Sequence, residues 1–148
     1  MTIVLTSLLL STIQEHGERC YPEEGAGVII GTTELESRIV TDILPINNAS
    51  DSSERHHRYL IAPREMLAAE IKAEELNLEV IGIFHSHPDH PAEPSEVDKQ
   101  WALPWYSYII TAVEEGKGTV SRAWLLAEDR TRFHEEEITI LETSSSKE

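Results

Sequence analysis

The chain lacks several kinds of residue, and each shortage excludes a class of protein. Cys20 is the single cysteine, so an internal disulfide is impossible; we expect a reducing, cytoplasmic setting and a buried, unreactive thiol. No apolar run approaches the roughly 20 residues of a transmembrane helix. The apolar start, residues 1–10, also lacks the basic segment and cleavage site of a signal peptide. The sequence therefore predicts neither a membrane span nor secretion.

Basic residues are scarce as well. The chain has 12 Lys and Arg against 27 Asp and Glu, which gives a formal net charge of −15. Because such a surface repels phosphate backbones and anionic lipids, we expect no nucleic acid and no membrane among its partners. Two explanations of the acidity stay open, an ordinary acidic cytosolic protein and a protein adapted to concentrated salt.

Length and patterning indicate one α/β domain. At 148 residues, of which 40% are hydrophobic, the chain can bury one core, so we predict a single domain over residues 1–142 and a disordered tail over residues 143–148. On a helix predicted over residues 63–76, we expect the apolar side chains to face inward, namely Met66, Leu67, Ile71 and Leu76. A polar stretch over residues 47–53 is typical of a flexible loop. Apolar spacing predicts helices over residues 6–16 and 63–76, a short helix from Ser95, and strands near 27–32, 38–46, 59–61, 80–84, 106–113, 119–127 and 130–140. This alternation predicts a curved mixed β-sheet flanked by helices.

The segment HSHPDHPAEPSEVD carries the clearest chemical signal. His85 and His87 continue a short buried strand, and residues two apart on a strand point to one face, so both imidazoles can converge while Ser86 turns away. Asp98 follows beyond a short loop. Two imidazoles and a carboxylate can hold a metal ion on three sides and leave a fourth position for water. The sequence predicts one zinc per chain, and iron, cobalt or manganese would also suit these ligands.

Ser95 and Asp98 have a second interpretation. Their spacing is that of a capping box, in which Ser95 caps a helix and Asp98 reaches back to the cap. That interpretation alone does not explain the two histidines just upstream. Ser95 could also donate a hydrogen bond to the oxyanion of a tetrahedral intermediate, and capping and donation do not compete.

The pattern H-x-H-x7-S-x2-D resembles the signature of the JAMM, or MPN-plus (JAB-type), metalloproteases. The resemblance implies a zinc enzyme that cuts peptide or isopeptide bonds next to the tails of ubiquitin or ubiquitin-like proteins. It also implies a catalytic glutamate three residues before the glycine that opens an apolar strand. Glu24 stands in that position relative to Gly27, whereas Glu23 is one residue out of register. Without the resemblance, Glu24 would be interpreted as a solvated acidic residue.

The resemblance further implies a mechanism and a substrate class. Glu24 would act as general base toward metal-bound water and pass the proton to the leaving amine. Compact bacterial members resemble enzymes that process sulfur-carrier proteins, so we expect hydrolysis of the bond after a C-terminal Gly-Gly. Two alternatives remain, a RadC-like protein associated with DNA repair and a non-catalytic MPN scaffold. The acidity and Glu24 disfavour the first, and the retained ligands disfavour the second. The oligomeric state does not follow from the sequence.

Overall fold

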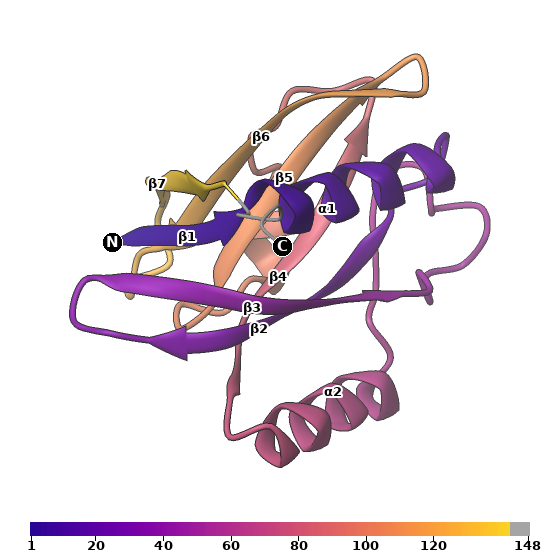
Figure 1. The fold of residues 1–148 in the computed structure, drawn as a ribbon. Coiled ribbons are helices and arrows are strands. Elements are labelled where there is room, and N and C mark those ends of the chain that lie inside the picture. Colours follow the sequence, from indigo (N-terminus) through magenta and orange to yellow (C-terminus); the bar gives the residue numbers. More distant parts are fainter. Residues whose placement is uncertain (143–148) are drawn as a thin grey trace.

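The computed structural model describes residues 1–142; the predicted tail over residues 143–148 lies outside them. Within this range the strands join into one closed barrel in the order β1-β3-β2-β4-β5-β6-β7 (Figure 1). None of the helices in this range is long and apolar enough to cross a membrane. The elements in chain order are β1 (Thr2–Thr6), α1 (Ser7–Cys20), β2 (Ala26–Thr33), β3 (Ser37–Ile46), α2 (Pro63–Glu75), β4 (Glu79–Pro88), α3 (Glu96–Trp101), β5 (Ser107–Glu114), β6 (Lys117–Leu126) and β7 (Phe133–Leu141).

The α/β class and the mixed sheet are confirmed, but the strands close into a barrel and do not form the expected curved sheet. Strand β1 closes it by pairing in parallel with both β3 and β7. This strand was missed, since its apolar run at the start of the chain is short and its partners are distant in sequence. Burial alternates along it, with Ile3 and Leu5 fully enclosed, as expected of a strand with one face in the core.

Helices cover both faces of the central strands. Ile29 packs with Ile13 of α1 in one hydrophobic cluster, while the neighbouring Val28 packs with Ala69 of α2 in a second. Figure 1 shows these helices on different sides of the sheet. Strand β2 is consequently buried along Ala26–Gly31, which explains its continuous apolar sequence. Gly27 has no room for a side chain, because a Cβ there would collide with the Phe84 ring.

Each long helix departs from its predicted form. Thr6 caps α1, its hydroxyl accepting from Leu9 N at 3.1 Å, but the helix continues to Cys20, beyond its predicted end at residue 16. Gly17 lies inside the helix, where α1 packs against Ser86 of β4. A Cβ at this position would lie too close to the Ser86 side chain. Of the predicted inner face of α2, Met66 does pack against the core, but the fully buried residues of this helix are Ala69 and Ala73. Small side chains let α2 approach the sheet closely, and larger ones are left exposed, namely Leu67, Ile71 and Leu76.

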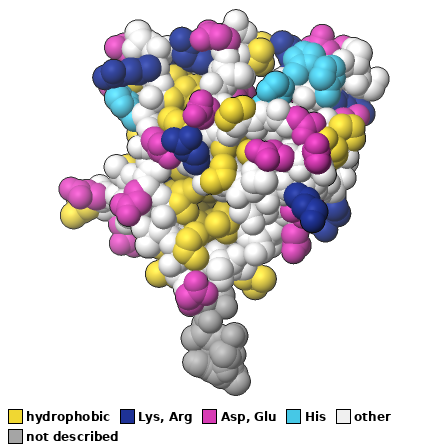
Figure 2. All heavy atoms as spheres, turned by 90° about the horizontal axis from the view of Figure 1, so that it is seen from above, with side chains coloured by type: hydrophobic (Ala, Val, Ile, Leu, Met, Phe, Trp, Pro, Cys, Tyr) yellow, Lys and Arg dark blue, Asp and Glu magenta, His cyan; other side chains and the backbone are white. Residues whose placement is uncertain are grey.

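On the face drawn in Figure 2, acidic side chains do not gather in one patch. Figure 2 shows one face on which acidic side chains are spread among hydrophobic ones and scattered lysine and arginine. Some acidic side chains form ion pairs, such as Glu93 and Glu135, which both contact Arg122. Such exposed pairs contribute little to stability.

Candidate metal centre

Strand β4 places His85 and His87 side by side. Both rings are buried, 1% and 5% exposed, and their centroids lie 5.1 Å apart. The strand lies between β2 and β5, so its backbone is fixed on both sides. His87 Nδ1 lies 2.9 Å from the carbonyl oxygen of Pro91 and donates to it, which turns Nε2 into the site. The two-residue spacing therefore does what the sequence predicted for it: both imidazoles share one face.

The first turn of α3 brings Asp98 against both histidines. Its Oδ2 lies 3.0 Å from His87 Nε2, and its Oδ1 lies 3.3 Å from His85 Nε2. The second contact has the distance of an ion pair but not the geometry of a hydrogen bond. The capping box is present as well: Ser95 N donates to Asp98 Oδ2, and Asp98 N donates to Ser95 Oγ. The cap thus aims the carboxylate at the histidines, and the two interpretations of this segment describe one structure.

Ser95 uses only part of its hydrogen-bonding capacity in the cap. Its N–H is committed to the Asp98 carboxylate and its hydroxyl oxygen accepts from Asp98 N. A hydroxyl has a donor hydrogen as well as acceptor sites. Any role for Ser95 toward an oxyanion therefore falls to this hydroxyl hydrogen.

Glu24 lies in the segment between α1 and β2, next to the histidines. Its side chain is 4% exposed, and ligand atoms of Glu24, His85 and His87 all lie within 4.8 Å of one another. Ser86, which points away from the two imidazoles, holds this segment in place. Its hydroxyl accepts from Gly25 N at 2.8 Å, and its own N–H donates to Gly25 O at 3.0 Å. The sequence assigned Ser86 no function, because its partner is distant in the chain.

The proximity of these groups changes their proton affinities. Burial raises the pKa of Glu24 to about 7, although the nearby His85 and His87 act to lower it. Burial acts to lower the pKa of His87, but the hydrogen bond and charge of Asp98 outweigh it and raise that pKa. Burial likewise acts to raise the pKa of Asp98, and the two histidines overcome this effect and hold it well below its usual value. The site therefore keeps the Asp98 carboxylate ionised, whereas the pKa of Glu24 lies near neutral pH.

Several buried atoms in this cluster lack partners, which tests whether a metal fits. Among the described residues, both ring nitrogens of His85 and Oε1 of Glu24 make no hydrogen bond. Each such group costs about 1–3 kcal/mol when left unsatisfied. Imidazole nitrogens and carboxylate oxygens are metal ligands, so a cation bound between them would remove this cost for one His85 nitrogen and for Glu24 Oε1. The residues fit a metal ion, with Glu24 or Asp98 available beside the histidines.

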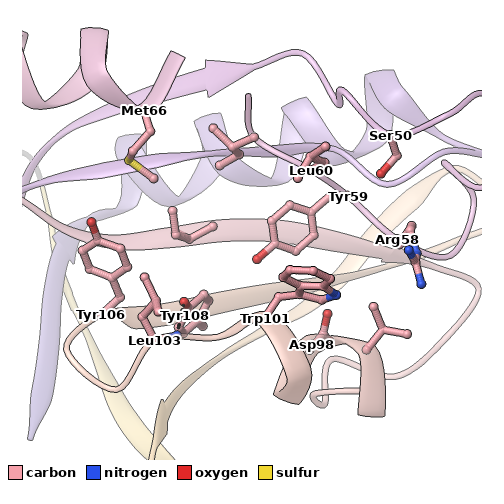
Figure 3. A pocket seen from close by; sticks show the side chains of 13 residues that line it. Ser50, Arg58, Tyr59, Leu60, Met66, Asp98, Trp101, Leu103, Tyr106 and Tyr108 are labelled. Carbon is pink, nitrogen blue, oxygen red and sulfur yellow. Dashed lines mark hydrogen bonds between the residues drawn. The ribbon is translucent and has the colours of Figure 1, made fainter. Parts of the chain in front are cut away.

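An apolar cavity of about 340 Å³ adjoins the centre. The ring of Tyr59 forms part of its wall and stacks on His85, with centroids 4.5 Å apart and planes 28° apart. Figure 3 shows Tyr59 near Trp101 and Asp98 of α3, with Met66 of α2 farther along the cavity. The predicted strand over residues 59–61 is wrong, because this segment is irregular. The apolar residues 59–61 were interpreted as a strand, and nothing in the sequence indicated that Tyr59 would cover His85.

The comparisons with known proteins agree with this geometry. Residues 6–127 match the family described as prokaryotic homologs of the JAB domain. The chain belongs to this family. The match confirms the JAMM/MPN-type resemblance found in the sequence. Among solved structures, a protein from Desulfitobacterium hafniense shares 32% identity at a TM-score of 0.83, covering 95% of this chain and 94% of its own. A JAB1/MPN domain protein from Archaeoglobus fulgidus shares the fold, with 18% identity, a TM-score of 0.55 and coverage of 94% and 99%.

Three relatives whose names state a function match shorter stretches of this chain than the solved structures do. A "probable TtuB-protein conjugate cleaving protease" from Thermus thermophilus is 32% identical over 81% of this chain and 73% of its own length. A desampylase from Haloferax volcanii is 30% identical over 69% and 71%. A desampylase from Pyrococcus furiosus is 42% identical, but the match spans only 45% of each chain.

Proposed function

We propose that this chain is a zinc-dependent peptidase or isopeptidase that hydrolyses the bond after the C-terminal Gly-Gly of a ubiquitin-like, sulfur-carrier-type protein. One observation carries the proposal: the fold gathers Glu24, His85, His87 and Asp98 into a buried cluster with unpartnered ligand atoms. The names of the relatives support the substrate class, since one describes cleavage of TtuB-protein conjugates and two are desampylases. Membership of the JAB family supports the reaction class.

The proposal assigns each residue a part. His85, His87 and Asp98 would hold the metal, which when bound supplies Lewis acidity that acidifies water and polarises the scissile carbonyl. Glu24 stands beside these ligands and accepts a proton, which it later delivers to the leaving amine. A base whose pKa lies near the working pH performs both transfers well, and burial acts in that direction by raising the pKa of Glu24. The Ser95 hydroxyl donates to the oxyanion of the transition state.

A Gly-Gly tail suits this setting for a steric reason. The histidines are almost completely enclosed, so the scissile bond must reach them through a narrow approach. Glycine has no side chain to clash there and accepts backbone conformations closed to other residues. The residue after the scissile bond leaves the site and is under less constraint than the glycines before it.

Defined substrates test this proposal. A ubiquitin-fold carrier with Gly-Gly-Cys, Gly-Gly-Ala or Ala-Ala-Cys ends is incubated with zinc-loaded protein, and release is followed by mass spectrometry. We expect cleavage of both Gly-Gly ends, and loss of that cleavage after chelation with recovery on adding zinc. Equal cleavage of the Ala-Ala end would remove the steric argument. No cleavage of any end would contradict the proposed substrate class.

The role of Glu24 is tested against its neighbour. Glu24→Gln keeps the size of the side chain but removes the base, so turnover should fall by about two to four orders of magnitude while the zinc content stays unchanged. Glu23→Gln is the matched control, because Glu23 is only half-buried and belongs to no ligand group in the described structure. A larger effect from Glu23→Gln would move the general base by one residue.

A further inference from the structure

Asn48 has an unusually complete set of hydrogen bonds for a residue in a segment expected to be flexible. Its Nδ2 donates to the carbonyl oxygens of Glu24 and Arg58, both at 3.0 Å. Its Oδ1 accepts from Ser50 N at 3.0 Å and from Leu60 N at 3.1 Å. A side-chain amide offers two donor hydrogens and an oxygen with two acceptor positions, so the capacity of Asn48 is fully used.

These bonds join the two segments that meet at the metal centre. One carries Glu24. The other, residues 48–60, carries Tyr59 against His85 and lines the apolar cavity. A further bond joins the same two segments, with Glu24 N donating to Arg55 O at 2.7 Å. Both peptide groups of Glu24 are therefore held by residues 48–60, one through Asn48 and one through Arg55.

The next residue along is held from the opposite side. Gly25 bonds through both its N–H and its carbonyl to Ser86 of β4. The backbone at Glu24 thus sits between a strand that carries the histidines and a loop that covers them. Its carboxylate Oε1, by contrast, has no partner among the described residues. The backbone is fixed and the carboxylate is left available.

We propose that Asn48 is a positioning residue for Glu24, tying it to the segment that covers His85 and lines the cavity. The inference rests on the proposed function, in which Glu24 is the base. Proton transfer requires the base within hydrogen-bond reach of the reacting group, and a misplacement of about 1 Å can reduce rates by about 100-fold. Asn48 touches no reacting atom and acts only through Glu24 and the covering segment.

A pair of identical substitutions at adjacent positions isolates this role. Asn48→Asp keeps the acceptor for Ser50 and Leu60 but removes the donor to Glu24 and to Arg58. Asn47→Asp makes the same chemical change one residue earlier, where the side chain is exposed and makes no hydrogen bond in the described structure. With the Gly-Gly substrate, we expect Asn48→Asp to lower kcat about tenfold to 100-fold, with KM and zinc content little changed. Asn47→Asp should match the wild type.

A double-mutant comparison separates positioning from general damage. If Asn48 acts through Glu24, Asn48→Asp should cause no further loss of kcat in the Glu24→Gln background. A full additional loss in that background would overturn the proposal, because the effect would then not depend on the base. Asn48→Ser, which shortens the side chain without adding charge, repeats the comparison if the aspartate variant folds poorly.

A second readout does not depend on activity. Amide hydrogen exchange, measured by NMR, reports the backbone at Glu24 and Gly25 separately from that at Ser50 and Leu60. We expect Asn48→Asp to speed exchange at Glu24 and Gly25, and Asn47→Asp to leave it unchanged. Unchanged exchange at these two amides would overturn the inference even if activity fell. Absence of cleavage by the wild type would contradict the proposed function instead, and the exchange result would still decide the role of Asn48.

Discussion

The raised pKa of Glu24 predicts an unusual pH dependence of stability in the metal-free protein. Burial raises this pKa from 4.5 to about 7. A carboxyl group whose pKa is raised by folding binds its proton more tightly in the folded state. Its contribution to stability is therefore fully present below pH 4.5 and is lost as the pH rises through about 7. Because each tenfold gain in proton affinity corresponds to about 1.4 kcal/mol, the whole effect is about 3 kcal/mol.

The perturbation that tests this is Glu24→Gln, which cannot ionise. Between about pH 5.5 and about pH 8, the free energy of unfolding of the wild type should fall by about 2 kcal/mol more than that of the variant. The raised pKa of His87 gives a dependence of the same sign, and because the charge of Glu24 is one of its causes, Glu24→Gln weakens that dependence too. The lowered pKa of Asp98 contributes only as the pH falls below 3.8, outside this range. The difference between the two proteins therefore reports the Glu24 carboxylate together with its effect on the pKa of His87.

Equilibrium urea unfolding, followed by tryptophan fluorescence after exhaustive chelation, provides the measurement. Chelation matters because metal binding requires deprotonated ligands and so strengthens as the pH rises, which opposes the effect. Equal pH dependence in wild type and variant would refute the reasoning. It would mean that the Glu24 carboxylate is solvated, despite its 4% exposure.

Two further predictions concern the walls of the same site. His87→Ala should abolish the binding of about one equivalent of zinc, measured by elemental analysis. His90→Ala is the control, because His90 is an exposed histidine in the following loop, and it should keep the zinc. Equal zinc in both variants would contradict the ligand assignment. Ser86→Ala removes the acceptor for the Gly25 N–H and should cost about 1–3 kcal/mol in urea unfolding. An unchanged unfolding free energy would show that the bond at Gly25 is replaced by another.

The chemical motif could be predicted because its parts are local. His85 and His87 are two residues apart on one strand, and Ser95 and Asp98 are three apart in one helix turn. Strand and helix periodicities alone place each pair on a common face. The role of Glu24 as general base was inferred differently, from a family resemblance. Nothing in the neighbouring sequence distinguishes Glu24 from the other acidic residues.

What the sequence by itself determined, then, is the α/β class, the order of most elements and the residues with ligand chemistry. Tertiary structure decided the rest, because the deciding contacts join residues far apart in the chain. Closure of the barrel depends on β1 meeting β7, and the inner face of α2 depends on how closely Ala69 and Ala73 approach the sheet. Asn48 was predicted only as part of a polar loop, since an asparagine reveals its role only once folding supplies partners for both ends of its amide.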